Sequence, residues 1–227
     1  MRHRWFASMS MLIACCAAAG GLLAQSLEAV PLPAPSVDGR RAVEQLLAQR
    51  RSVRDFSDAS LSASEVGQLL WAAQGINDPE GLRTAPSAGA LYPLEVYLIA
   101  GAVKGLPSGL YRYKPVGHRL VKIASGDRRE VLARAAFGQS WLADAAAIIA
   151  FTAIPERTRN KYGVRAERYV HIEIGHAAEN LFLQAEALDL GTVVVGAFDD
   201  DEVTEVLQLP ATTHPYLLMP VGRPTAR

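Results

Sequence analysis

Cysteine is nearly absent from this sequence, and neither sign of charge is in excess. The two cysteines are the neighbours Cys15 and Cys16, and 23 basic side chains balance 23 acidic ones among 227 residues. The cysteine-free remainder excludes disulfides, iron–sulfur clusters, thiolate zinc sites and a cysteine nucleophile. Balanced charge without a long run of one sign gives no general attraction to phosphate backbones, so the sequence predicts no nucleic-acid partner.

Several common catalytic motifs are also missing. The chain has no G-x-G-x-x-G turn after a strand, no P-loop and no G-x-S-x-G nucleophile elbow. Glu173 and His176 have the spacing of a di-iron ligand pair, but no second E-x-x-H completes such a site. His171 would lie about 140° around the same helix from His176, too far to share one metal. We therefore predict no metal, and a structural or capping role for His176.

The N-terminal residues have a composition of their own. Arg2 and Arg4 precede a mostly apolar stretch that ends at Ala24, which is typical of a secretory signal peptide over residues 1–24. A retained membrane helix is the alternative, because the stretch is close to the ~20 apolar residues that a span requires. Export predicts a bacterial periplasmic protein with no transmembrane span after processing.

A second processing signal overlaps the first. Residues 12–15 resemble a bacterial lipobox, which would leave Cys15 lipidated and the protein anchored to a membrane. The residues that follow are still apolar, where a lipoprotein usually has a polar tether. Three prolines then predict a stiff linker over residues 25–35: Pro31, Pro33 and Pro35. One folded domain is expected over residues 36–227.

The spacing of apolar residues predicts the elements of this domain. Asp38 is a candidate N-cap for a helix with three residues on a core face: Val43, Leu46 and Leu47. Ser62 and Glu65 form a capping box for a second helix, which Gly75 would end. Further helices are predicted over residues 127–137, 166–188 and 200–207, and strands over residues 95–100, 109–114, 119–124, 145–153, 192–196 and 216–221. This order predicts an α+β fold, and the wholly apolar run 145–153 requires helices on both faces of its sheet.

The segment from Arg50 to Phe56 carries two arginines around a hydroxyl. In an extended chain side chains alternate, so Arg50, Ser52 and Arg54 would point to one side and Val53 to the other. Two guanidiniums that flank a hydroxyl suit a phosphate group, which they hold by charge-assisted hydrogen bonds. The alternative is a basic patch at a helix end, where arginines complement the helix dipole.

The same segment resembles the R-[RH]-S-x-[RK]-x-F signature of the FMN-dependent nitroreductase family. Further matches follow in the family's order: Thr84 to Pro93, Gly109 to Tyr113, Gly138 and Gln139, Lys161 to Arg165, and Gly175 to Leu181. The P-S-A-G-A-L-Y-P form of residues 86–93 looks like the SagB-type, or thiazoline and oxazoline dehydrogenase, branch. The resemblance covers about residues 48–224 and implies a nitroreductase-like fold, with a central mixed β-sheet flanked by helices on both faces.

The resemblance also implies one FMN, held without covalent attachment between the subunits of a homodimer. The matched cofactor-binding residues are Arg50, Arg51, Ser52, Arg54, Pro86, Ser87, Ala88, Gln139, Gly196 and, in a looser alignment, Arg223. Arg50, Ser52 and Arg54 would hold the phosphate. Residues 86–88 would come from the partner subunit and pack against the isoalloxazine. Gln139 would contact the pyrimidine edge, and the backbone of Gly196 would approach flavin N5 or O4. Ala90 and Val195 replace an Asn and a Glu of many members, so those two side-chain contacts are not expected.

Lys161 and Tyr162 match a pair that resembles the catalytic Lys-Tyr pair of azoline oxidases. Oxidising an azoline removes a proton from carbon while a hydride goes to the flavin, so a base must stand opposite the flavin. A lysine desolvated beside a tyrosine could be that base, because burial lowers the pKa of an ammonium. The alternative is a polar loop, since Arg157, Arg159 and Asn160 precede the pair.

We therefore expect an exported FMN-dependent oxidoreductase that transfers hydride through flavin N5 and is similar to SagB-type dehydrogenases. Its substrate would be a small molecule or a peptide, although an export signal argues against azoline chemistry on cytosolic peptides. An NAD(P)H-dependent nitro or quinone reductase is the alternative enzyme, and nicotinamide is scarce outside the cytoplasm. A flavin-binding partner protein without catalysis is a third possibility.

Overall fold

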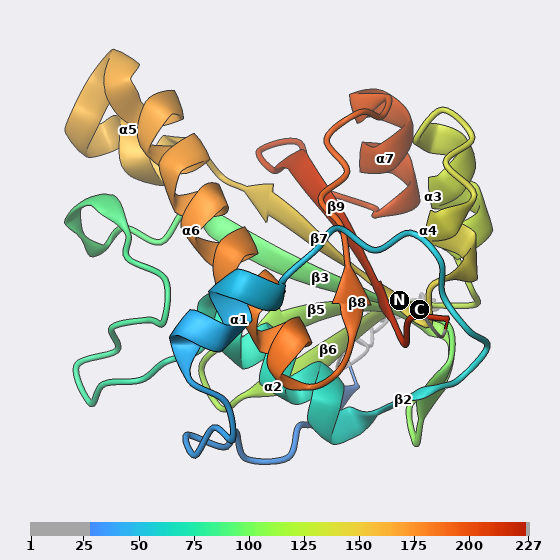
Figure 1. Cartoon of the computed structure of the whole chain (residues 1–227). Helices are drawn as coiled ribbons and strands as arrows, with labels where there is room; N and C mark the ends of the chain where they lie inside the picture. The colour runs from blue at the N-terminus through green and yellow to red at the C-terminus, as the bar shows by residue number, and fades with distance from the viewer. Residues whose placement is uncertain (1–27, 226–227) are drawn as a thin grey trace, which may run out of the picture.

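The computed structural model describes residues 28–225 (Figure 1). The predicted signal peptide, Cys15 and its lipobox lie outside these residues. Within the described part of the chain, no helix combines the length and the apolar character needed to cross a bilayer.

A seven-stranded sheet runs through the molecule in the order β1-β6-β5-β3-β7-β9-β8. Its strands are β1 (Ala29–Pro31), β3 (Leu94–Ala100), β5 (Gly109–Lys114), β6 (Arg119–Ser125), β7 (Ala147–Ala153), β8 (Gly191–Thr192) and β9 (His214–Gly222). Every pair of neighbours is antiparallel, so the sheet is antiparallel and not mixed. The one parallel ladder among the described residues joins β2 (Leu61–Ser62) to β4 (Val103–Lys104), outside this sheet.

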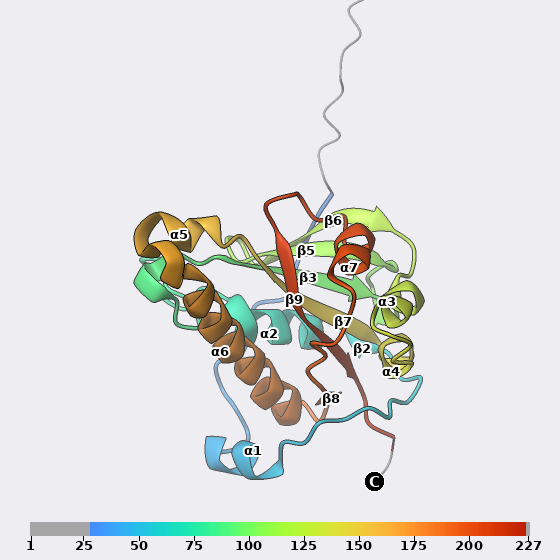
Figure 2. The ribbon, with the colours of Figure 1, turned by 90° about the horizontal axis from the view of Figure 1, so that it is seen from above.

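Helices cover both faces of the sheet, as predicted (Figure 2). Helices α2 (Ala63–Gln74) and α6 (Ala166–Ala187) pack on one face, and α3 (Arg129–Ala135), α4 (Trp141–Asp144) and α7 (Asp200–Val206) pack on the other. Along β7, Ile149 and Phe151 join the first core while Ile148 and Ala150 join the second. A strand buried on both sides needs such a layer on each.

The first two helices differ at their N-termini, because only the second has a side-chain cap. The predicted capping box forms, with Glu65 N donating to Ser62 Oγ at 3.2 Å and Ser62 N donating to Glu65 Oε2 at 2.8 Å. Helix α1 (Val43–Gln49) begins later than predicted, because Ala42 and not Asp38 precedes its first turn. Its predicted core face is also wrong in two of three places: Leu46 is buried, but Val43 and Leu47 are 51% and 53% exposed. Helix α1 thus leaves an apolar side uncovered in the single chain.

Other element boundaries differ from the predicted ones, in part because strands pair with distant segments that the local pattern does not specify. The predicted linker contains β1, which pairs with β6 at the sheet edge. The predicted strand over residues 192–196 shortens to β8, because Val195 leaves the ladder for an isolated bridge to Leu218. The predicted helix over residues 127–137 ends at Ala135. The polar stretch before Tyr162 is helix α5 (Glu156–Tyr162), and short 3₁₀ turns form at η1 (Ala88–Ala90) and η2 (Gly163–Arg165).

Candidate functional site

The segment after α1 runs along the outer edge of β8. Val53 N donates to Thr192 O at 2.9 Å, and the Val53 side chain lies so close to Gly191 that a β-carbon there would be 2.6 Å from Val53 Cγ1. Ser52 and Arg54, by contrast, are exposed. The predicted alternation of faces is therefore confirmed at these three residues.

The arginines of this segment have different surroundings. Arg50 lies with Cζ 5.1 Å from the centroid of the Phe182 ring, and its Nε is 3.8 Å from Glu179 Oε1. Arg54 Cζ lies 5.7 Å from the centroid of the Trp141 ring. Both guanidiniums rest on aromatic rings and keep donors available to a ligand.

Arg51 and Arg223 are engaged elsewhere. Arg51 Nη1 donates to the carbonyls of Ala48 and Arg50, at 3.1 and 2.7 Å, so it serves the C-terminal end of α1. Arg223 Nη2 donates to Glu65 Oε1 at 2.6 Å. Partial burial raises the pKa of Glu65, but the bonds from Ser62 and the Arg223 charge outweigh it and hold that pKa below its usual value. Arg223 therefore belongs to the N-terminal end of α2 in this structure, and its looser alignment gains no support.

Gln139 and Gly196 come together near the start of α4. Gln139 Nε2 donates to the Ala136 and Ala197 carbonyls, both at 2.8 Å, which fixes the amide beside Gly196. Gly196 is exposed, and a β-carbon there would meet only Leu217 Cδ2, at 3.7 Å. It lines a hollow of about 550 Å³ that also includes residues of α5, α6 and β9. The backbone at Gly196 is thus open to a flat ligand.

The P-S-A-G segment lies against the Lys161–Tyr162 pair. Gly89 has a left-handed φ of 64°, and a methyl group in place of its hydrogen would be 2.9 Å from Lys161 Nζ and 2.9 Å from the Tyr162 hydroxyl. The two motifs therefore lie side by side at this glycine, although Gly89 and Lys161 are 72 residues apart in sequence. Lys161 is exposed in the single chain, so the expected desolvation is not present there. The pair ends helix α5 and is not part of a loop.

Two arginines hold the P-S-A-G segment from behind. Arg83 Cζ lies 4.3 Å from the centroid of the Tyr92 ring, and Arg157 Nη1 donates to Tyr92 O at 2.9 Å. Ser87 Oγ accepts from Tyr92 N at 2.9 Å and closes the turn. The backbone needs this support, because Tyr92 adopts a φ of 46°, which is costly for an aromatic residue.

Glu173 lies beneath this segment, a position that its spacing from His176 did not indicate. The side chain is 2% exposed, and its Oε1 has no hydrogen-bond partner. Burial raises the pKa of Glu173 to about 7, and the Ser87 hydroxyl and the Arg83 charge oppose the rise. The sequence signal that could have indicated this buried carboxyl is its position on the apolar face of the predicted helix over residues 166–188. Within residues 28–225, no three His, Cys, Asp or Glu side chains gather as a metal site.

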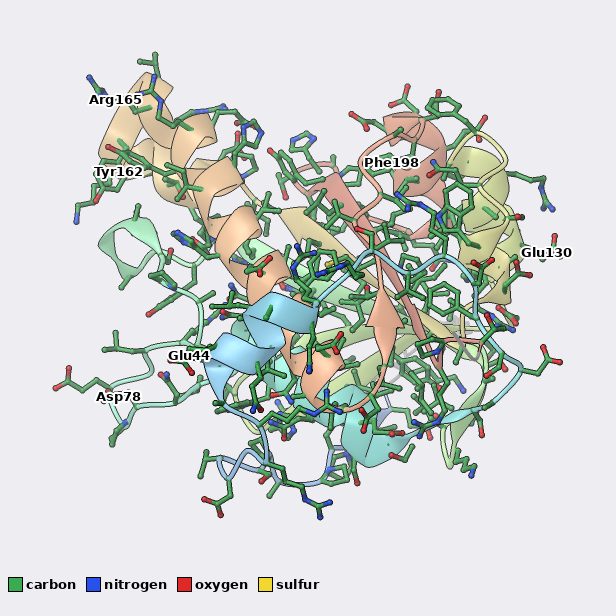
Figure 3. The ribbon with its side chains drawn as sticks, viewed as in Figure 1. Glu44, Asp78, Glu130, Tyr162, Arg165 and Phe198 are labelled. Atoms are coloured by element: carbon green, nitrogen blue, oxygen red, sulfur yellow. The ribbon has the colours of Figure 1, made fainter. Side chains whose placement is uncertain are left out.

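The predicted site residues thus form two groups that different elements carry. One group, the phosphate end, comprises Arg50, Ser52, Arg54, Gln139 and Gly196. The other, the motif end, comprises residues 86–89, Lys161 and Tyr162. Helix α5 lies at one side and helices α3, α4 and α7 at the other in both views, and Figure 3 shows Tyr162 apart from Phe198. The hollow at Gly196 extends between them, because Arg159 of α5 also lines it.

Known proteins are similar to this chain in sequence and in architecture. The sequence profile of the nitroreductase family matches residues 47–223. The chain belongs to the nitroreductase family. A family relative from Methanocaldococcus jannaschii, described as a nitroreductase, is 45% identical over 181 residues, which are 80% of this chain and 90% of that one. A crystal structure of a nitroreductase from Ralstonia eutropha shares 30% identity and a TM-score of 0.77, over 88% of this chain and 90% of that one.

The similarity to the SagB-type branch is more distant. The microcin B17-processing protein McbC of Escherichia coli is 28% identical over 166 residues, which are 70% of this chain and 61% of McbC. The resemblance seen in the sequence is therefore confirmed for the family and its α+β fold. The protein is a nitroreductase-family oxidoreductase.

Proposed function

We propose that this protein binds FMN and transfers hydride through the flavin N5 atom. The family supports the cofactor class, and the residues of the phosphate end fit it. Ser52 and Arg54 are exposed on one face of an extended segment, and no carboxylate lies within ion-pair distance of Arg54 among residues 28–225. A phosphate monoester requires such unengaged forked and hydroxyl donors.

The remaining residues of the phosphate end fit a flat ring. Gly196 presents backbone without a β-carbon, and Gln139 keeps its amide oxygen as an acceptor because its nitrogen is already bound to two carbonyls. We assign Gln139 to the pyrimidine edge and the Gly196 backbone to N5 or O4. Bound FMN would supply the hydride acceptor, while the protein supplies position and electrostatics.

The separation of the two groups supports a homodimer. A site that needs both the phosphate end and the motif end can be completed by two copies, each giving one end to its partner. The exposed apolar residues Val43 and Leu47 of α1 supply surface for such an association. Residues 86–88 and the Lys161–Tyr162 pair would then face the ring held by the other subunit.

One observation carries the assignment of the chemistry: a β-carbon added at Gly89 would lie 2.9 Å from both Lys161 Nζ and the Tyr162 hydroxyl. The pair therefore lies beside the segment matched to the flavin, where it offers a proton acceptor and a proton donor. On a dimer, the partner's surface would exclude water from the surroundings of Lys161. We propose that Lys161 takes a proton from substrate carbon and that Tyr162 orients the substrate or the lysine.

Two substrate classes are compatible with the similarities, and the Lys161–Tyr162 pair distinguishes them. The similarity to McbC, together with the P-S-A-G-A-L-Y-P segment, favours dehydrogenation of an azoline-like ring in a small molecule or peptide. The stronger similarity to a protein described as a nitroreductase favours the alternative, reduction of nitro or quinone compounds by NAD(P)H. Oxidation needs the base at Lys161, whereas reduction of a quinone does not, so the two functions differ in their dependence on this residue.

We also propose export to the bacterial periplasm. The basic residues Arg2 and Arg4 before the apolar stretch support it, and lipidation at Cys15 is the anchored variant of the same proposal. N-terminal sequencing of protein from the native host should begin near Gln25, or be blocked if Cys15 is lipidated. An intact Met1 in the cytoplasmic fraction would contradict export.

A subunit-mixing experiment tests the proposed function. Lys161→Ala damages the motif end and Arg54→Ala the phosphate end, so neither homodimer has an intact site. Random exchange makes about half of the dimers mixed, each with one fully intact site, so about a quarter of the parental dehydrogenase activity should return. Mixing two preparations of the same variant is the control. No recovery in the mixed sample would show that one chain supplies both ends, and the shared site would be abandoned.

A further inference from the structure

A second hollow, of about 390 Å³, lies behind the P-S-A-G segment. The start of β3, the end of β5 and the turn between β5 and β6 form its walls, and Arg83 and Arg157 close it on the side of the segment. None of the residues matched to flavin contacts lines it. It is therefore a separate cavity, and nothing in the proposed function uses it.

The charge of this cavity is one-sided. Glu95 is the one carboxylate that lines it, and five cationic side chains face that carboxylate: Arg83, Arg112, Lys114, Arg119 and Arg157. Glu95 is already satisfied, since Arg112 Nη2 lies 2.7 Å from one carboxylate oxygen and Arg157 Nη2 lies 2.5 Å from the other. The remaining three cations have no carboxylate within 4.0 Å among residues 28–225.

These cations repel one another in a partly dry environment. Burial and then the charge of Arg112 lower the pKa of Lys114, and Arg157 and Arg119 add to the effect. Burial also lowers the pKa of Arg83, and the charges of Glu173 and Glu95 oppose that effect. Two strands and a turn hold these groups close together, whereas surface lysines can move apart in solvent. The repulsion among the cations therefore raises the free energy of the empty cavity, and a bound anion would lower it.

A buried amide forms part of the cavity wall. Gln74 lines the cavity and is 1% exposed, and its Oε1 accepts from Arg83 Nη1 at 2.6 Å. Its amide nitrogen is directed at the buried carboxyl of Glu173. Gln74 thus holds Arg83 at the wall, and the charges of the cavity carry the argument for a ligand.

We propose that this cavity binds a dianion of the phosphate monoester class. Lys114 and Arg119 would supply charge, and Arg83 would supply a fork of N–H donors to the phosphate oxygens. Pro115 and the 69% exposed Val116 form an apolar rim suited to the organic part of the ligand. A phosphate monoester carries about −1.5 to −2 charges at neutral pH and so matches this excess better than a monoanion does.

Phenyl phosphate is the probe, titrated by calorimetry into FMN-loaded protein at constant ionic strength. Benzenesulfonate, a monoanion of similar shape, is the matched ligand. We expect saturable binding of phenyl phosphate and at least about tenfold weaker binding of benzenesulfonate, since charge and donors both favour the dianion. Absence of saturable binding, or equal affinity for the two probes, would overturn the proposal.

Variants locate the bound probe. Lys114→Gln combined with Arg119→Gln should raise the dissociation constant of phenyl phosphate at least about tenfold. Lys104→Gln combined with Arg134→Gln removes two exposed cations elsewhere and should leave it unchanged. Arg119→Gln alone changes an exposed side chain and keeps the test valid if the double variant fails to fold. Loss of probe binding in Arg54→Ala, with normal binding in the Lys114 and Arg119 variants, would place the probe at the phosphate end and overturn the proposal.

Discussion

The phosphate end and the motif end are built in different ways. At the phosphate end, exposed side chains on an extended segment rest on aromatic rings, and the segment is tied to β8 by one backbone bond at Val53. At the motif end, Arg83 and Arg157 hold a turn with left-handed residues above the buried Glu173. Affinity for a phosphate needs available charge, whereas proton transfer needs accurate position. The four predictions below test this contrast.

The largest effect is expected at the motif end. Lys161→Ala should reduce turnover of a dehydrogenation substrate by about 10²-fold or more, the usual contribution of a positioned acid or base, without loss of FMN. Tyr162→Phe should also reduce turnover without releasing flavin. Arg168→Ala, an exposed cation on α6, is the control. Steady-state rates and flavin content per subunit are the measurements. Parental turnover in both pair variants would make the pair a surface feature and favour the quinone reductase function.

At the phosphate end the effect should fall on binding. Arg50→Ala and Arg54→Ala should each weaken FMN binding by about 1.5–3 kcal/mol, the range for hydrogen bonds to a charged group. Arg51→Ala should weaken it less, because that side chain serves the carbonyls at the end of α1. Fluorescence titration of the apoprotein measures all three. Equal losses in all three variants would favour a general basic patch over a phosphate site.

Glu173 gives the motif end a pH signature. A carboxyl whose pKa rises from 4.5 to about 7 on folding binds a proton more tightly in the folded state. It therefore stabilises the fold at low pH, and stability declines as the pH rises from about 5 through 7. With about 1.4 kcal/mol per pKa unit, the decline is on the order of 2 kcal/mol.

Glu173→Gln keeps the shape and removes the titration, so urea unfolding from pH 5 to 8 should show a flatter profile than the parent. Glu44→Gln, on the exposed surface of α1, should keep the parental slope. Parallel profiles for the parent and the Glu173 variant would mean that the buried carboxyl does not titrate in this range.

The smallest effect is expected at Arg223. Because its guanidinium is engaged by Glu65, Arg223→Gln should leave FMN affinity unchanged and lower the free energy of unfolding by at most about 1 kcal/mol, as for a partly exposed ion pair. Equilibrium unfolding and flavin titration on one preparation give both values. A tenfold loss of FMN affinity would return Arg223 to the phosphate end.

Local chemistry explains which parts of the fold the sequence predicts well. The capping box at Ser62 and the long apolar run of β7 are complete within a few residues, so their pattern alone predicts them. Strand β1 and the short β8 depend on distant partners in β6 and β9, which no local pattern specifies. Helix α5 had a local signal that composition concealed: Pro155 before the first turn, Glu156 within it and Gly163 after the last.

The candidate site divides in the same way. Alternation predicted that Ser52 and Arg54 point away from Val53, because it depends only on extended backbone. The contact of Gly89 with Lys161 and the position of Glu173 under Ser87 are products of tertiary packing, and spacing could not supply them. The exposure of Lys161 in the single chain shows a further limit, since desolvation depends on what covers a side chain.

The three residues of β1 have a practical consequence for handling the protein. Very short strands form both edges of the sheet: β1 pairs with β6 at one edge and β8 pairs with β9 at the other. A protein trimmed to begin at Ser36, the domain start suggested by composition, would lose β1 and bare the seven-residue edge of β6. Unpaired strand edges join to one another, so this shortened chain should aggregate on concentration, whereas one that begins at Gln25 should stay dispersed.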